Sequence, residues 1–307
     1  MTDFVQPRAL RPGDRVAVIA ASSPPGQTKL DGGVRALEAE GFTVDVFDSA
    51  RATGTEYDYL AGDDVLRARD LTAALADPAY AAIFMACGGY GAQRTLELVD
   101  WSRVDPARPK AVIGYSDVTA LLEAIAVKLG WGSFFGPLVA TDSFHLGRGD
   151  YAFDTLMAML RGSISELTFP DARTITPGVA EGVTLGGTAS LLAASLGTDT
   201  SLPARGAILF LEDVDEFLFR LDRILTQLRR SVYVEGVAGI VLGTFTECGD
   251  PRDVERLLAD RFHDLGVPVL AGADIGHNIP TQTFPIGVPA RLDTEAGTLT
   301  LLKPPVT

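Results

Sequence analysis

The chain of 307 residues is long enough for one large α/β domain or two ordinary ones with substantial cores. Hydrophobic residues make up 47% and charged residues 21%, a composition that is typical of globular proteins and excludes a disordered chain. The 40 acidic and 26 basic residues give a formal net charge of −14, and such a surface repels phosphate backbones and anionic lipids. We therefore expect neither nucleic acid nor a membrane surface as a partner.

The N-terminal sequence, the hydrophobic stretches and the cysteines indicate where the protein is located. No apolar stretch approaches the roughly 20 residues that span a bilayer, and residues 1–15 lack the apolar segment of a signal peptide. The two cysteines, Cys87 and Cys248, exclude a disulfide scaffold, although they allow one bond. From these features we expect a cytoplasmic protein.

In the first half of the chain, apolar β-branched runs alternate with amphipathic segments. Strands are expected at 15–21, 42–46, 81–85 and 110–113, and helices at 30–40, 66–76, 118–129 and 151–160. This alternation predicts a mainly parallel sheet that is covered by helices on both faces.

The pattern changes after residue 160. Pro170, Pro177 and several glycines interrupt the periodicity, so we expect a junction there. Farther along, helices are expected at 189–196, 215–230 and 252–265, strands at 207–211, 237–242 and 268–270, and a β-hairpin at 290–302. The prediction is an N-terminal doubly wound parallel-sheet domain (1–165), a linker (166–184) and a smaller C-terminal α/β domain (185–307).

Ser116 directly follows the strand expected at 110–113, and a helix begins close behind it near Asp117. A strand-to-helix turn presents a serine hydroxyl above the sheet edge, and the N–H groups of the first helical turn point to the same spot. These donors and the positive end of the helix dipole suit a developing oxyanion. The alternative is a helix N-cap, a position that serine and aspartate favour, because the turn is not a complete Gly-x-Ser-x-Gly elbow.

A glycine-rich loop, Gly88-Gly89-Tyr90-Gly91, follows the strand expected at 81–85. Its glycines allow the close backbone approach that an oxyanion hole or a substrate cradle needs. The spacing does not match the Gly-x-Gly-x-x-Gly pattern of dinucleotide binding, and a plain tight turn is the alternative. Cys87 offers a rival nucleophile, although an isolated cysteine after an apolar run is usually a small buried hydrophobic residue.

Three histidines are available as a catalytic base. His263 lies late in an expected helix, whereas His145 and His277 lie in polar loops. Catalytic bases are common in such loops, and His277 leads slightly because it closely follows an expected strand.

Glu212 ends the apolar strand expected at 207–211, where a carboxylate could orient a histidine. The alternative is that it belongs to an acidic first turn of the next helix, together with Asp213, Asp215 and Glu216.

Metal chemistry has little support in the sequence. There is no His-Glu-x-x-His motif, and the three histidines and two cysteines show no paired ligand spacing. We expect neither a metal nor another cofactor.

Taken in order along nearly the whole chain, these segments resemble the LD-carboxypeptidase family of serine peptidases, which includes the microcin C self-immunity hydrolases. The motifs that carry the resemblance are Gly88-Gly89-Tyr90-Gly91, Ile113-Gly114-Tyr115-Ser116-Asp117, Phe135-Gly136-Pro137, Leu209-Phe210-Leu211-Glu212-Asp213, Arg220-Leu221-Asp222-Arg223 and Gly276-His277-Asn278.

The resemblance implies a Ser-Glu-His triad, which falls on Ser116, Glu212 and His277. It also implies an oxyanion hole made by backbone N–H groups, here those of Gly89 and Asp117, with Gly88 in the same substrate-binding loop. The active site would lie at the junction of the two domains. Family members commonly act in the cytoplasm and form homodimers.

The implied reaction is release of a C-terminal D-Ala from murein tetrapeptides in cell-wall recycling. One departure is Cys87, which stands where many members have arginine, so the role of that arginine does not carry over. The segment 162–185 lacks tryptophan and is too short for the aromatic loop that holds a nucleotide in microcin-type members, which favours a murein peptide. The alternatives are a microcin C-like peptide-nucleotide amide hydrolase and a non-catalytic protein that binds small peptides.

Overall fold

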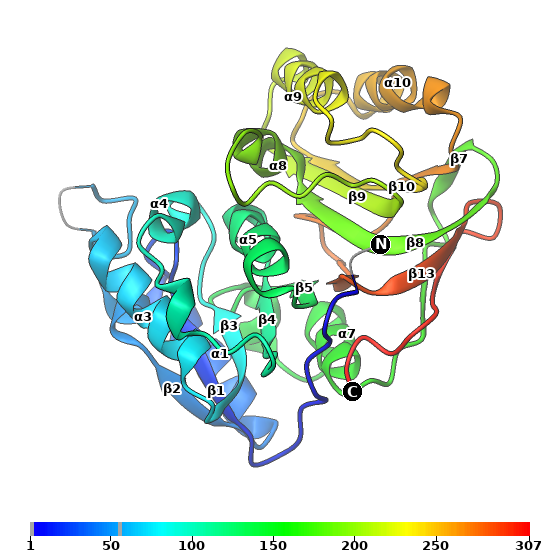
Figure 1. Ribbon diagram of the computed structural model, residues 1–307. Coiled ribbons are helices and arrows are strands. Elements are labelled where there is room, and N and C mark those ends of the chain that lie inside the picture. Colours follow the sequence, from blue (N-terminus) through cyan, green and yellow to red (C-terminus); the bar gives the residue numbers. More distant parts are fainter. Residues whose placement is uncertain (1–2, 55–56) are drawn as a thin grey trace.

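Two β-sheets organise the molecule in the computed structural model, which describes residues 3–54 and 57–307. Within these residues the first sheet has six strands in the order β12-β5-β4-β3-β1-β2, and the second has eight in the order β6-β14-β13-β8-β9-β10-β11-β7. In Figure 1 the first sheet lies at the lower left, and the second at the upper right beneath α9 and α10. The predicted α/β architecture with a parallel N-terminal sheet is confirmed.

The first sheet is built from five parallel strands and one antiparallel edge strand. Its strands are β1 (Arg15–Ile19), β2 (Thr43–Val46), β3 (Tyr80–Met85), β4 (Ala111–Gly114), β5 (Ser133–Phe135) and the antiparallel β12 (Phe284–Ile286). Every residue of β3 and β4 is buried, as a parallel sheet covered on both faces requires. Its helices are α1 (Gln27–Ala39), α2 (Asp48–Arg51), α3 (Asp64–Ala76), α4 (Ala92–Leu96), α5 (Thr119–Leu129), α6 (Asp142–Leu146) and α7 (Tyr151–Leu160).

The strand order of the first sheet reverses at the middle, between β1 and β3. In doubly wound sheets, ligands bind beyond the carboxyl ends of the strands at such a switch point. The loops that follow β1 and β3 meet there, because the Ser23 N–H donates to the Gly88 carbonyl oxygen at 3.1 Å. The topology thus places the glycine-rich loop at the binding edge of the sheet.

The second sheet has a parallel centre flanked by antiparallel strands. Its strands are β6 (Glu166–Thr168), β7 (Arg173–Thr176), β8 (Val179–Thr188), β9 (Ala207–Val214), β10 (Gly239–Thr246), β11 (Val269–Ala271), β13 (Pro289–Asp293) and β14 (Thr298–Leu301). Strands β8 to β11 are parallel neighbours. The helices of this part are α8 (Ala189–Ser195), α9 (Leu218–Arg230) and α10 (Pro251–Phe262); the apolar face of α9 buries Leu221, Leu225 and Leu228.

The stretch 166–184, expected to be a linker, instead supplies β6, β7 and most of β8 to the second sheet. These strands are hard to predict from the sequence, because proline and glycine interrupt this stretch and because none except β8 is long enough to show an alternating pattern. Strand β12 lies beyond residue 185 but pairs with β5, so the chain returns to the first sheet near its end. The exact domain boundaries stay a prediction.

Within the described residues, no helix combines the length and the hydrophobicity that are needed to cross a bilayer.

Candidate active site

Ser116 lies in a strained turn between β4 and α5. Its φ is +62°, a left-handed conformation that is uncommon for a residue with a side chain and clusters at functional sites. The turn needs glycine at position 114, because a Cβ there would lie 2.6 Å from the Val118 side chain. The N-cap position of α5 is occupied by Val118, and no side-chain cap bond is present there. The N-cap alternative for Ser116 is therefore wrong.

Glu212 and His277 are joined by a hydrogen bond of 2.7 Å between Oε2 and Nδ1. Glu212 is fully buried within β9, which continues to Val214, whereas His277 lies in the loop after β11 with a side chain that is 14% exposed. A buried carboxylate that accepts from Nδ1 fixes the tautomer and leaves Nε2 free to act as a base.

The alternative for Glu212, an acidic first turn of the next helix, is also wrong. Helix α9 begins only at Leu218 and has no acidic residue in its first turn. The neighbouring Asp213 accepts hydrogen bonds from the backbone N–H and the hydroxyl of Ser190 in α8. Burial raises the pKa of Asp213 to about 6.

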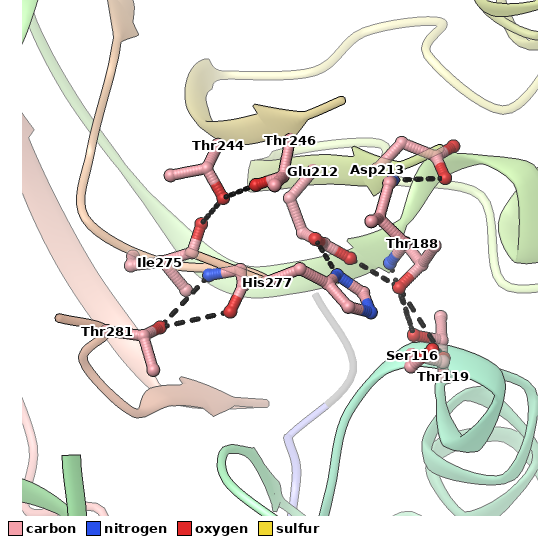
Figure 2. Close-up of polar contacts among 12 residues, drawn as sticks. Ser116, Thr119, Thr188, Glu212, Asp213, Thr244, Thr246, Ile275, His277 and Thr281 are labelled. Carbon is pink, nitrogen blue, oxygen red and sulfur yellow. Dashed lines mark hydrogen bonds and ion pairs between the residues drawn. The ribbon is translucent and has the colours of Figure 1, made fainter. Parts of the chain in front are cut away.

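The imidazole of His277 lies between Glu212 and Ser116, with its second ring nitrogen turned toward the serine (Figure 2). No hydrogen bond joins Ser116 Oγ to the ring among the described residues, and such bonds commonly tighten only in the substrate complex. The Tyr115 ring packs against the imidazole with 4.8 Å between ring centroids. Burial raises the pKa of Tyr115 to about 12, so the phenol stays neutral.

Thr188, the last residue of β8, connects the two halves of the site. Its hydroxyl donates to Glu212 Oε1 and lies 3.5 Å from the Ser116 carbonyl oxygen, and its backbone N–H donates to Thr119 Oγ1 at 3.1 Å. A Cβ at Gly187 would lie 2.5 Å from Thr119 Cγ2, so glycine is required where β8 approaches α5. The carboxylate of Glu212 thus has a partner on each oxygen.

The glycine-rich loop lies against the serine. A Cβ at Gly88 would sit 3.3 Å from Ser116 Oγ, so this glycine keeps the space around the hydroxyl open. Gly89 has a φ of +96°, and Ser23 holds the loop by accepting a hydrogen bond from the Tyr90 N–H at 3.1 Å. The loop is therefore more than a plain turn, since its conformation is adapted to the serine.

The side chain of Asp117 fastens this loop to the nucleophile turn. Its Oδ2 accepts from the Ser22 hydroxyl at 2.6 Å and from the Ala92 N–H at 2.8 Å. Burial raises the pKa of this carboxyl group. Outside the regular elements, the described residues show no backbone hydrogen bond donated by the Gly89 N–H. The role of the Gly89 and Asp117 N–H groups as oxyanion donors stays a prediction.

The rival candidates lie in less suitable places. Burial raises the pKa of the Cys87 thiol, which disfavours the reactive thiolate. His145 is exposed and its ring lies against Gly32 of α1, and the exposed His263 bonds the carbonyl of Ala259 in the preceding helix α10. In the described part of the chain, no cluster of His, Cys, Asp or Glu is arranged to hold a metal ion.

Sequence models of one family match both halves of this arrangement. Residues 16–136 match the LD-carboxypeptidase N-terminal domain, and residues 181–292 match the LD-carboxypeptidase C-terminal domain. The chain belongs to the LD-carboxypeptidase family.

The similarity to individual relatives covers nearly the full length of this chain. A protein of Streptomyces coelicolor with a provisional carboxypeptidase name is 42% identical, over 99% of this chain and 98% of that protein. The murein tetrapeptide carboxypeptidase of Pseudomonas aeruginosa is 33% identical, over 91% of this chain and 93% of its own. The crystal structure of an MccF-like protein from Bacillus anthracis is 27% identical with a TM-score of 0.86, covering 97% of this chain and 99% of that one.

The sequence predicted the three central residues but missed those that support them. Thr188, Tyr115 and Ser23 contact Glu212, His277 and the glycine-rich loop through tertiary structure. The one available signal was the Ser22-Ser23 pair at the end of β1, because polar residues at the carboxyl end of a parallel strand lie where ligands bind.

Proposed function

We propose that this protein is a serine carboxypeptidase that cleaves an L,D-peptide bond and releases a C-terminal D-Ala from murein tetrapeptides. One observation carries the proposal: the buried Glu212 carboxylate binds His277 on one oxygen and Thr188 on the other, beside the strained Ser116. Membership of the LD-carboxypeptidase family and the name of the Pseudomonas aeruginosa relative support the choice of substrate.

In the first half of the reaction, His277 Nε2 accepts the proton of Ser116 Oγ while this oxygen attacks the carbonyl carbon that precedes the terminal D-Ala. The N–H groups of Gly89 and Asp117 stabilise the oxyanion of the tetrahedral intermediate. Glu212 remains ionised and stabilises the imidazolium. The carbon–nitrogen bond then breaks, His277 returns the proton to the leaving amine, and D-Ala departs.

In the second half, water attacks the ester on Ser116. His277 takes a proton from the water and returns it to Ser116 Oγ as the carbon–oxygen bond of the ester breaks. The products are the free enzyme and the shortened peptide with a new carboxylate.

A second candidate is a peptide-nucleotide amide hydrolase, which the likeness to the MccF-like structure favours. Against it, the segment 162–185 is occupied by β6, β7 and part of β8 and contains no tryptophan, so it offers no long aromatic loop for a base. Homodimer formation, a cytoplasmic location and a role in wall recycling remain predictions from the family resemblance.

Turnover of competing substrates distinguishes these functions. The panel contains a tetrapeptide ending in D-Ala, the same peptide ending in L-Ala, and an aminoacyl sulfamoyl adenosine. We expect the protein to cleave only the first. Preference for the adenosine compound would support the second candidate, and binding of the tetrapeptide without cleavage would indicate a non-catalytic peptide-binding protein.

A further inference from the structure

A cavity of about 230 Å³ opens beside the imidazole of His277. It is lined by the buried Phe135 at the end of β5, by the buried Gly136 and Pro137 that follow, and by residues of the segment 276–282. Pockets that bury drug-sized ligands commonly measure about 300–1,000 Å³. This cavity is smaller, so it suits one small amino acid better than a nucleotide.

The charges around the cavity are few. Apart from His277, the charged side chains among the described residues that line it are Lys29 of α1 and Asp142 of α6. They form an ion pair of 2.8 Å, with side chains that are 50% and 67% exposed. Lys29 is therefore the one lysine or arginine of this lining, and it lies at the rim.

We propose that this cavity binds the leaving C-terminal residue and that Lys29 binds its α-carboxylate. The inference rests on the proposed function, because a carboxypeptidase must recognise the free carboxylate at the end of its substrate. His277 and Lys29 both line the cavity, so in this proposal the terminal residue places its amide at the imidazole and its carboxylate at the ammonium group.

The ion pair between Lys29 and Asp142 does not prevent Lys29 from binding a substrate carboxylate. Ion pairs between exposed side chains contribute little to stability, so an entering carboxylate replaces Asp142 as the partner of Lys29 at little cost. The ion pair with Asp142 holds the lysine at the rim. The other polar lining residues, Thr141, Ser143 and Thr281 among them, are neutral and cannot supply this charge.

The test compares the tetrapeptide that ends in D-Ala with the same peptide ending in D-Ala amide, for the wild type and Lys29→Gln. We expect Lys29→Gln to raise KM for the free acid by up to roughly 5-fold, the upper range for an ion pair of a half-exposed side chain, with a smaller change in kcat. Hydrolysis of the amide should change little.

The matched control is Lys128→Gln, which breaks the ion pair with Asp199 outside the lining of this cavity and should leave both substrates unaffected. Unfolding curves check that both variants are folded, and Asp142→Asn should not raise KM for the acid. An unchanged KM for the acid in folded Lys29→Gln overturns the assignment of Lys29 while the proposed function stands. If the wild type cleaves neither peptide, the proposed function is wrong and this inference falls with it.

Discussion

The hydroxyl of Thr188 donates a hydrogen bond to Oε1 of Glu212, on the side of the carboxylate that does not face His277. Thr188 ends β8 in the second sheet, yet its backbone N–H is bonded to Thr119 in the first turn of α5. One residue thus orients the carboxylate and connects it to the helix that follows the nucleophile.

We expect Thr188→Val to lower kcat by roughly 10- to 100-fold with little change in KM, because a hydrogen bond to a charged group contributes about 1.5–3 kcal/mol. Steady-state kinetics of D-Ala release measure both constants. Thr188→Ser is the control, because it retains the hydroxyl and should recover most of kcat. Equal loss in the two variants would show that the hydroxyl bond to Glu212 does not account for the effect.

A second prediction concerns the space around the nucleophile. In Gly88→Ala the new methyl group would meet Ser116 Cβ at 3.1 Å and Oγ at 3.3 Å, contacts that displace the hydroxyl. Since small displacements of reacting groups are costly, kcat should fall roughly 10-fold or more. Gly26→Ala is the matched control, because nothing lies within 4 Å of its added Cβ and its φ is −63°. Full activity of Gly88→Ala would contradict the close packing of loop and serine.

A third prediction concerns Cys87. Burial raises the pKa of its thiol, and Asp117 adds to the shift, so little thiolate forms near neutral pH. Cys87→Ala should therefore retain most of the wild-type kcat/KM for D-Ala release. Loss of activity in the folded variant would instead support Cys87 as the nucleophile.

The extent to which the sequence predicts this molecule differs between its parts. Helices with strong apolar stripes and fully apolar strands were located well, such as α7 at Tyr151–Leu160 and β3 at Tyr80–Met85. The three-residue strands β5, β6 and β12 were not, because so few residues carry no detectable period. Their place in the sheets depends on partners that are distant in the chain.

In the candidate site, too, some residues can be predicted from the sequence and others cannot. Ser116, Glu212 and His277 are candidates by position, because each follows or ends a strand and carries a reactive group, and the family resemblance implies them as a triad. Thr188 and Tyr115 were missed, because threonine at a strand end and tyrosine after a glycine have many ordinary explanations. Only the approach of β8 to α5 gives Thr188 its contact with Glu212.

Stability should depend on pH through Glu123 of α5. Its Oε1 accepts from the Leu202 N–H at 2.8 Å, and burial raises its pKa from 4.5 to about 7, although hydrogen bonds from Leu202, Ser195 and Tyr233 act in the opposite direction. The folded state therefore binds this proton more tightly than the unfolded chain. The resulting stabilisation is complete below pH 4.5 and is lost as the pH rises through 7.

The comparison is with Glu123→Gln, which keeps an acceptor for Leu202 but cannot ionise. Relative to this variant, the free energy of unfolding of the wild type should fall by at most about 3 kcal/mol between acidic and neutral pH. Urea denaturation at a series of pH values measures the difference. Parallel pH profiles for the two proteins would show that Glu123 does not titrate in this range.

The central claim is that Ser116 attacks the peptide bond before a terminal D-Ala. Mass spectrometry of the products from a purified L-Ala-D-Glu-diamino acid-D-Ala tetrapeptide tests it most directly, with the wild type and Ser116→Ala side by side. The account predicts D-Ala release by the wild type and a rate lower by roughly 10³- to 10⁶-fold in the variant, as in other catalytic triads. Comparable release by a folded Ser116→Ala protein would contradict it.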